Sequence, residues 1–184
     1  MHGSYPFSQW TINEIVADRY GLRAPVDAPA GAYSLEVAIG QGEPFEVGAI
    51  EIQQSDRILT EPKVEHPVEA ALGDSIELVG YNIDQAGESS RLTLVWRALQ
   101  SIDADYTVFT HVLDPLGKQI GGQDNQPVND TYPTSRWAAG EYVIDPYVLK
   151  DLAKVFEPSQ GYTIEVGLYD PETGARLGST VRLK

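Results

Sequence analysis

An internal repeat constrains the fold of this chain more than any single residue does. The stretch Tyr132-Pro-Thr-Ser-Arg-Trp137 has a counterpart 127 positions earlier, Tyr5-Pro-Phe-Ser-Gln-Trp10. Residues 5–23 and 132–150 are identical at nine of nineteen positions. After a shift of two positions, the match resumes between residues 33–39 (Tyr-Ser-Leu-Glu-Val-Ala-Ile) and 162–168 (Tyr-Thr-Ile-Glu-Val-Gly-Leu). A repeat of this length indicates that one structural unit occurs twice.

The first copy of the unit is incomplete. Residues 1–53 match only the C-terminal half of the second copy, residues 128–184. We therefore predict a half unit over 1–53, a linker over 54–63 and a complete unit over 64–184. The linker is predicted because residues 53–64 lack strand alternation and contain a Glu-Pro-Lys run. We expect the chain to be part of a longer protein that carries such units in tandem.

Short strands dominate the pattern along the chain. Twelve prolines and seventeen glycines interrupt runs of alternating apolar and polar residues, which is typical of β-structure. In the half unit, strands are predicted over 15–22, 33–39 and 47–52. The complete unit has seven, over 76–83, 92–98, 106–114, 118–123, 142–149, 162–169 and 181–183, and an extra helical turn fits residues 151–156. This spacing predicts an all-β, antiparallel β-sandwich of the immunoglobulin or fibronectin-III type.

Alternation also predicts which side chains form the core. Every second residue of the strand over 92–98 is apolar, so Trp96 should be the central aromatic of the core. Both faces of the strand over 107–113 carry apolar residues, which predicts a strand covered on both sides. His111 lies in that strand, and we interpret it as a hydrogen-bonded core residue. His2 and His66 form no cluster with it that would suggest a metal site.

Composition excludes several classes of partner. Thirteen basic against twenty-seven acidic residues give a net charge of −14, which argues against nucleic acid and against an anionic membrane surface. The chain has no cysteine, so it can form neither a disulfide nor a thiolate metal site. Its apolar runs are all shorter than the roughly 20 residues of a membrane-spanning helix. We predict no metal and no cofactor.

A family resemblance rests on five stretches of the complete unit: Gly73-Asp-Ser-Ile-Glu-Leu-Val-Gly-Tyr-Asn-Ile-Asp84, Leu92-Thr-Leu-Val-Trp96, Asp105-Tyr-Thr-Val-Phe-Thr-His-Val-Leu-Asp114, Tyr132-Pro-Thr-Ser-Arg-Trp137 and Tyr162-Thr-Ile-Glu-Val-Gly-Leu-Tyr-Asp170. They resemble the β-rich domain that follows the membrane part of large bacterial glycosyltransferases similar to dolichyl-phosphate-mannose protein mannosyltransferases. The resemblance implies an extracytoplasmic accessory domain whose parent is anchored in a membrane. The catalytic carboxylates of that family belong to the membrane part, so no catalytic residue is carried over.

Three functions are compatible with these patterns. The first is a non-catalytic accessory or interaction domain. The second is a carbohydrate-binding module in which Tyr132, Arg136 and Trp137 form a patch that Tyr5 and Trp10 duplicate, because aromatic rings stack on the apolar faces of sugars. Against this second function, Trp137 could instead plug the end of the sandwich.

The third function is an unrecognised hydrolase. Its candidate carboxylates would be Asp103 with Asp105, or Asp124 near Asp130. Nothing in the sequence sets their separation at the distances that glycoside hydrolysis requires.

The half unit poses a physical problem, because a sheet of two or three strands is marginally stable alone. Residues 1–53 could pack on the sandwich of the same chain, pair with the same segment of a second chain in a homodimer, or compete with residues 128–184 for the single copy of 64–127. Intramolecular packing with some dimer contact is the arrangement we expect.

Overall fold

A computed structural model describes residues 7–17, 19–22, 24–25, 27–53, 55–86, 89–150 and 161–183. The chain divides into two compact units, Met1–Gln54 and Ser55–Lys184. We call them the hairpin unit and the sandwich unit. Residues 55–63, which the sequence placed in a linker, therefore belong to the sandwich unit.

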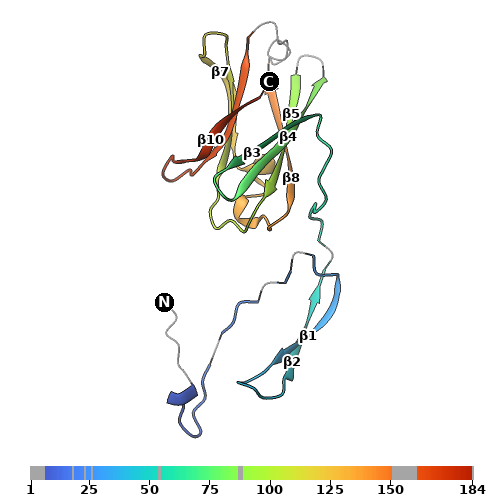
Figure 1. Cartoon of the computed structure of the whole chain (residues 1–184), viewed down its shortest axis with the longest axis vertical. Helices are drawn as coiled ribbons and strands as arrows, with labels where there is room; N and C mark the ends of the chain where they lie inside the picture. Colours follow the sequence, from blue (N-terminus) through green and yellow to red (C-terminus); the bar gives the residue numbers. More distant parts are fainter. Residues whose placement is uncertain are drawn as a thin grey trace. The chain divides into compact units, whose positions relative to one another are not determined.

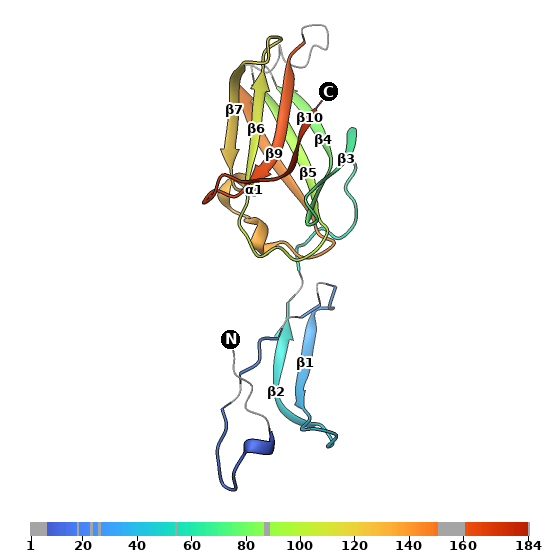
Figure 2. The same ribbon diagram turned by 60° about the vertical axis from the view of Figure 1, so that its left-hand side comes forward.

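The sandwich unit contains two four-stranded antiparallel sheets that face each other (Figure 1). The first sheet has the order β3 (His66–Leu72), β4 (Ile76–Ala86), β5 (Ser89–Ala98) and β8 (Tyr142–Lys150). The second has the order β10 (Arg176–Leu183), β9 (Thr163–Tyr169), β6 (Thr107–Leu113) and β7 (Gln119–Asn125). Figure 2 shows the second sheet from its outer side. The predicted all-β antiparallel sandwich is confirmed.

The seven strands predicted for this unit are present, and an eighth was missed. Strand β3 escapes the alternation test because Pro67 lies in it and Glu69 adopts a left-handed φ of 53°, which interrupts its pairing with β4. Strand β10 begins five residues earlier than predicted, since a register shift around Gly178 hides its first part from a pattern search. The helical turn proposed for 151–156 lies outside the described residues.

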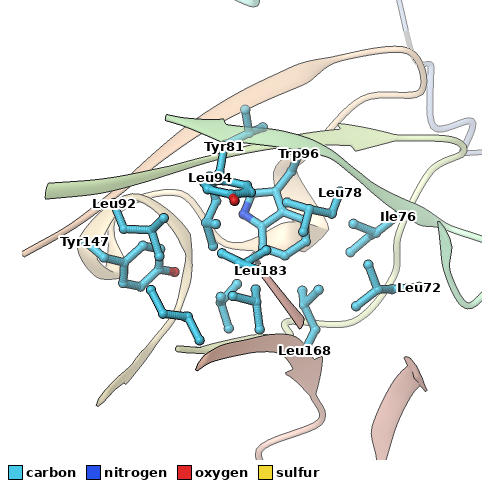
Figure 3. Packing of buried hydrophobic residues seen from close by; sticks show 14 of the residues in the cluster. Leu72, Ile76, Leu78, Tyr81, Leu92, Leu94, Trp96, Tyr147, Leu168 and Leu183 are labelled. Carbon is cyan, nitrogen blue, oxygen red and sulfur yellow. The ribbon is translucent and has the colours of Figure 1, made fainter. Parts of the chain in front are cut away.

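The core lies between the two sheets, and Trp96 is at its centre (Figure 3). Trp96 is fully buried, as predicted from its place in β5. Each such large apolar side chain contributes roughly 1.5–3 kcal/mol by leaving water. The first sheet contributes Leu72, Ile76, Leu78, Leu92 and Leu94, and the second contributes Val108, Ile164, Val166, Leu168 and Leu183.

The outer face of the central strand β6 in the second sheet is also largely buried. Phe109 faces away from the main core yet is only 2% exposed, because the guanidinium of Arg176 lies 4.7 Å from its ring centre. His111 follows on the same outer face, where its Nε2 lies 3.2 Å from Asp124 Oδ1. Strand β6 is thus buried on both faces, as predicted. His111 is hydrogen-bonded, but at the outer face of the sheet and not in the core.

A second, smaller cluster covers the outer face of the first sheet. Val79, Val95 and Tyr142 are buried there, and Ile58 and Val64 from the segment before β3 pack against them. Ile58 also forms a β-bridge with Tyr142. The start of the sandwich unit is therefore built into the fold.

The hairpin unit contains a single antiparallel pair within its described residues, β1 (Gly31–Val37) with β2 (Phe45–Ile52), and a short 3₁₀ helix η1 (Phe7–Gln9). These two strands overlap the predictions for 33–39 and 47–52. The prediction of a strand over 15–22 is wrong, since the described residues of that stretch have no strand conformation.

Two glycines provide a matched test of packing at the sandwich edge. Gly178 and Gly174 have φ values of 72° and 73°, so alanine strains both backbones alike. A Cβ at Gly178 would lie 2.6 Å from the backbone nitrogen of Gly73, whereas a Cβ at Gly174 meets nothing within 4 Å. We expect Gly174→Ala to lower the free energy of unfolding by about 1 kcal/mol and Gly178→Ala by about 3 kcal/mol or more. Urea denaturation measures both, and equal losses would contradict the close approach of these two segments.

Candidate functional site

The repeated motif forms the loop that leads into β8. After the short turn α1 (Pro127–Asp130) comes the 3₁₀ helix η2 (Thr134–Arg136). Thr134 is fully buried, and its Oγ1 donates to Ala104 O at 2.6 Å while accepting from Tyr106 N at 2.9 Å. Trp137 is 3% exposed, and its Nε1 donates to Tyr132 O at 3.2 Å. The motif is thereby held in place by the buried Thr134 in its middle and by Trp137, which belongs to the main core, at its C-terminal end.

A buried carboxylate, Glu141, organises the polar groups of the loop. Its Oε2 accepts from Ala138 N at 2.8 Å and its Oε1 accepts from Tyr132 Oη, also at 2.8 Å. Arg57 forms an ion pair with the same carboxylate, which is only 3% exposed. Both oxygens of the Glu141 carboxylate therefore have hydrogen-bond partners within the chain.

Arg57 reaches this carboxylate from the first residues of the sandwich unit. Its Nη1 also donates to Tyr132 Oη at 2.7 Å and to Arg136 O at 2.9 Å. Burial and the bond to Glu141 raise the pKa of Tyr132 to about 12, so its hydroxyl stays a neutral donor. A surface cavity of about 370 Å³ adjoins this group and is lined by Asp56, Arg57, Ile58, Val128, Tyr132, Glu141, Tyr142, Val143 and Ile144.

A second carboxylate, Asp145, lies in the core itself. It is fully buried and accepts three hydrogen bonds, from Tyr147 Oη at 2.7 Å, Val128 N at 2.8 Å and Trp96 Nε1 at 3.1 Å. Burial raises the pKa of Asp145 to about 6, although the three hydrogen bonds oppose the shift. The same burial, with Asp145 beside it, raises the pKa of Tyr147.

Asp145 holds a strained turn. Val128, Asn129 and Asp130 have consecutive left-handed φ values of 54°, 56° and 65°. Such a φ is unusual for a β-branched residue and persists only where the surroundings impose it. The bond from Val128 N to the Asp145 carboxylate supplies one such restraint, and the Asp130 carboxylate, which accepts from Gln126 N at 2.8 Å, supplies another.

The two copies of the motif share their local geometry. The 3₁₀ helices η1 and η2 start 127 positions apart. In the hairpin unit Thr11 N donates to Glu14 at 2.9 Å, matching Ala138 N and Glu141. Asn13 has a left-handed φ of 67°, and its counterpart Gly140 has one of 82°. The repeat is therefore present in the local structure as well as in the sequence.

The structure keeps Tyr132, Arg136 and Trp137 of the predicted carbohydrate patch on one loop but buries much of their aromatic surface. Trp137 has no exposed ring face on which a sugar could stack, and Tyr132 is half-buried with its hydroxyl engaged. Arg136 is exposed. Trp10 belongs to the hairpin unit and is 39% exposed, and Tyr5 lies outside the described residues. The alternative in which Trp137 plugs the sandwich agrees with its burial.

Three of the four candidate carboxylates of the hydrolase alternative have structural partners. Asp105 accepts from Ser135 N at 3.2 Å, Asp130 accepts from Gln126 N, and Asp124 contacts His111. Across the described part of the chain, no group of three or more His, Asp or Glu side chains could hold a metal ion. Within the same part, no helix is long and apolar enough to cross a membrane.

Sequence reasoning missed the roles of Glu141, Asp145 and Arg57. The two acids had a signal, because both are among the nine identities of the repeat, matching Glu14 and Asp18. Asp145 also lies at an inward position of β8 between Val143 and Tyr147, where a charged residue is unexpected. Arg57 had no such signal, since it lies 84 positions from Glu141.

Comparison with known proteins does not assign the chain to a family. No family model matches the chain, and no curated protein matches it. Among solved structures, it is similar to two of Bacteroides uniformis β-glucuronidase 2, a calcium-binding mutant and a form covalently bound to cyclophellitol-6-carboxylate aziridine. Identities are 13% and 14% and TM-scores 0.39 and 0.38, over 60% of this chain. The chain spans only 13% of the length of those chains. The class that the fold defines is an antiparallel β-sandwich domain.

The raised pKa of Asp145 makes stability depend on pH. The folded state, with a pKa of about 6, binds this proton more tightly than the unfolded state at 3.8. The contribution is therefore fully present below the unfolded pKa and is lost as pH rises through 6, by about 3 kcal/mol. The variant Asp145→Asn has no titrating group at this position, so its free energy of unfolding should lack this pH dependence. Urea unfolding at several pH values between about 4 and 7.5 measures it. If the two proteins give parallel pH profiles, Asp145 does not titrate as assigned.

Proposed function

We propose that this chain is a non-catalytic accessory domain of a larger protein, built from tandem sandwich units. In this proposal the repeated motif anchors the connector, by which we mean the segment around Arg57 and Ile58 that follows the hairpin unit. The observation that carries this proposal is the contact of Arg57 with Glu141, Tyr132 and the carbonyl of Arg136. Arg57 lies three residues after the end of the hairpin unit. The conspicuous groups of the motif thus bind the chain's own connector.

The connector is held by backbone as well as side-chain contacts. Tyr142 N donates to Ile58 O at 2.8 Å, which pairs the connector with the outer edge of β8. This bridge occupies the first residue of β8, an edge strand whose unpaired backbone groups could otherwise pair with another chain. A connector fixed at this point supports a spacer or interaction role.

The strand order supports an immunoglobulin-like or fibronectin-III-like arrangement. Strands β5 and β8 pair in one sheet while β6 and β9 pair in the other, so the chain crosses between sheets in the Greek-key manner of those sandwiches. Strand β3 then adds one strand at the edge of β4. The resemblance to the domain that follows the membrane part of bacterial glycosyltransferases supports an extracytoplasmic location and a membrane-anchored parent.

One observation favours carbohydrate binding as a second candidate. Trp10 is 39% exposed, whereas its counterpart Trp137 is 3% exposed. In the sandwich unit, the cavity beside Tyr132 and Arg57 offers polar groups and the half-buried Tyr132, but Trp137 does not line it.

Removal of the connector anchor tests the first proposal. Arg57→Ala leaves Glu141 buried without its cation, so we expect the free energy of unfolding to fall by about 3 kcal/mol. Arg182→Ala is the matched control, because it removes an exposed pair with Glu165 worth less than about 1 kcal/mol. Chemical denaturation gives both losses, and limited proteolysis should cut near residue 57 only in Arg57→Ala. Equal effects of the two variants would rule out the anchor role.

A glycan array separates the two candidate functions. For an accessory domain we expect no sugar to be retained by the intact chain. A sugar that binds the intact chain and is lost in Trp10→Ala would favour the carbohydrate-binding module. Circular dichroism of Trp10→Ala should first show that its strand content is unchanged.

A further inference from the structure

The hairpin unit exposes apolar side chains on both of its strands. Val37 is 41% exposed and Phe45 is 52% exposed, although both belong to regular strands. A two-stranded hairpin with such side chains in water is marginally stable at best. The exposed apolar residues of the hairpin and its flank include Tyr33, Val37, Ile39, Phe45, Val47 and Ile50.

The repeat shows what covers the equivalent surface in the sandwich unit. Leu35, Val37 and Ile39 correspond to Ile164, Val166 and Leu168 of β9. The three residues of β9 are at most 1% exposed and belong to the main core. There they face side chains of β3, β4 and β5, which come from residues 64–127.

Strand β1 also lacks, among the described strands, the second edge partner that its counterpart β9 has. Strand β9 pairs with β10 on one side and with β6 on the other, from Thr107↔Tyr169 to Leu113↔Thr163. Strand β1 pairs with β2 and with no other described strand. In the sandwich unit the edge partner of β9 (β6) and three of the four strands of the facing sheet (β3, β4 and β5) come from one continuous stretch, β3 to β7, while the fourth facing strand is β8.

We propose that the apolar face of the hairpin unit is a docking surface for a half sandwich with the strand pattern of residues 64–127, supplied by another stretch of polypeptide. This chain's own residues 64–127 are already closed by β8, β9 and β10. The partner would place strands like β4 and β5 over Leu35, Val37 and Ile39 and a strand like β6 along the edge of β1. This inference rests on the proposed tandem architecture and names the partner that the first unit takes.

An added half sandwich tests the docking surface. A second copy of residues 64–127 is joined to the N-terminus of the complete chain, and amide hydrogen exchange is followed strand by strand. We expect exchange in β1 and β2 to slow at least 100-fold while the protein remains monomeric by light scattering. The matched control carries Leu94→Asp in the added copy only, which spoils its core face and should leave β1 and β2 as fast as in the original chain.

A further variant keeps the test decisive. Val37→Asp in the extended chain should abolish the new protection of β1 and β2 and leave β9 protected, which shows that the sandwich unit remains folded. Exchange in β1 and β2 that stays fast in the extended chain, whether it is monomeric or aggregated, would overturn the proposal. Dimeric original chain with β1 and β2 already protected would also overturn it, in favour of a second copy of residues 1–53 as the partner. Failure of the connector anchor appears separately in Arg57→Ala, which does not involve the added half.

Discussion

The pairing of β8 with β5 and of β9 with β6 is the constraint on which the sandwich depends. Each pair joins a strand from the first half of the unit to a strand from the second half, and the two pairs lie in different sheets. Neither half can therefore bury its apolar face without the other. The main core mixes residues of both halves for this reason, with Trp96 from the first half beside Tyr147 and Leu168 from the second.

The repeated motif sets where the second half of the unit begins. Thr134 and Trp137 fix the loop to the core. Glu141 and Asp145 fix the start of strand β8 through buried hydrogen bonds. A buried carboxylate is costly unless its oxygens are satisfied, so these contacts must form together. Arg57 completes the group with a charge from the connector. The motif that resembles a binding site in the sequence therefore has most of its polar groups hydrogen-bonded within the chain.

Much of the fold could be predicted from the sequence, and the failures have physical causes. Alternation located the sandwich strands that pack in the usual way, but β3 contains Pro67 and a left-handed Glu69 and gave no periodic signal. Residues 15–22 match the sequence of β8 closely and still form no strand where the structure describes them. Strand β8 has β5 to pair with, whereas Ile15 is 96% exposed. Arg57 was missed because its site is made by tertiary contact alone.

The comparison of the two copies distinguishes what is local from what is tertiary. The turn from Thr11 to Glu14 keeps the hydrogen bond and the left-handed residue of its counterpart, so short-range sequence is enough to form it. The strand that follows requires a neighbour and does not form from the same pattern of residues. Burial of Trp137 against 39% exposure of Trp10 follows the same division, since one copy has an opposing sheet in its own unit. The motif therefore specifies a shape locally, and whether it is an anchor or an accessible surface depends on the half of the unit that meets it.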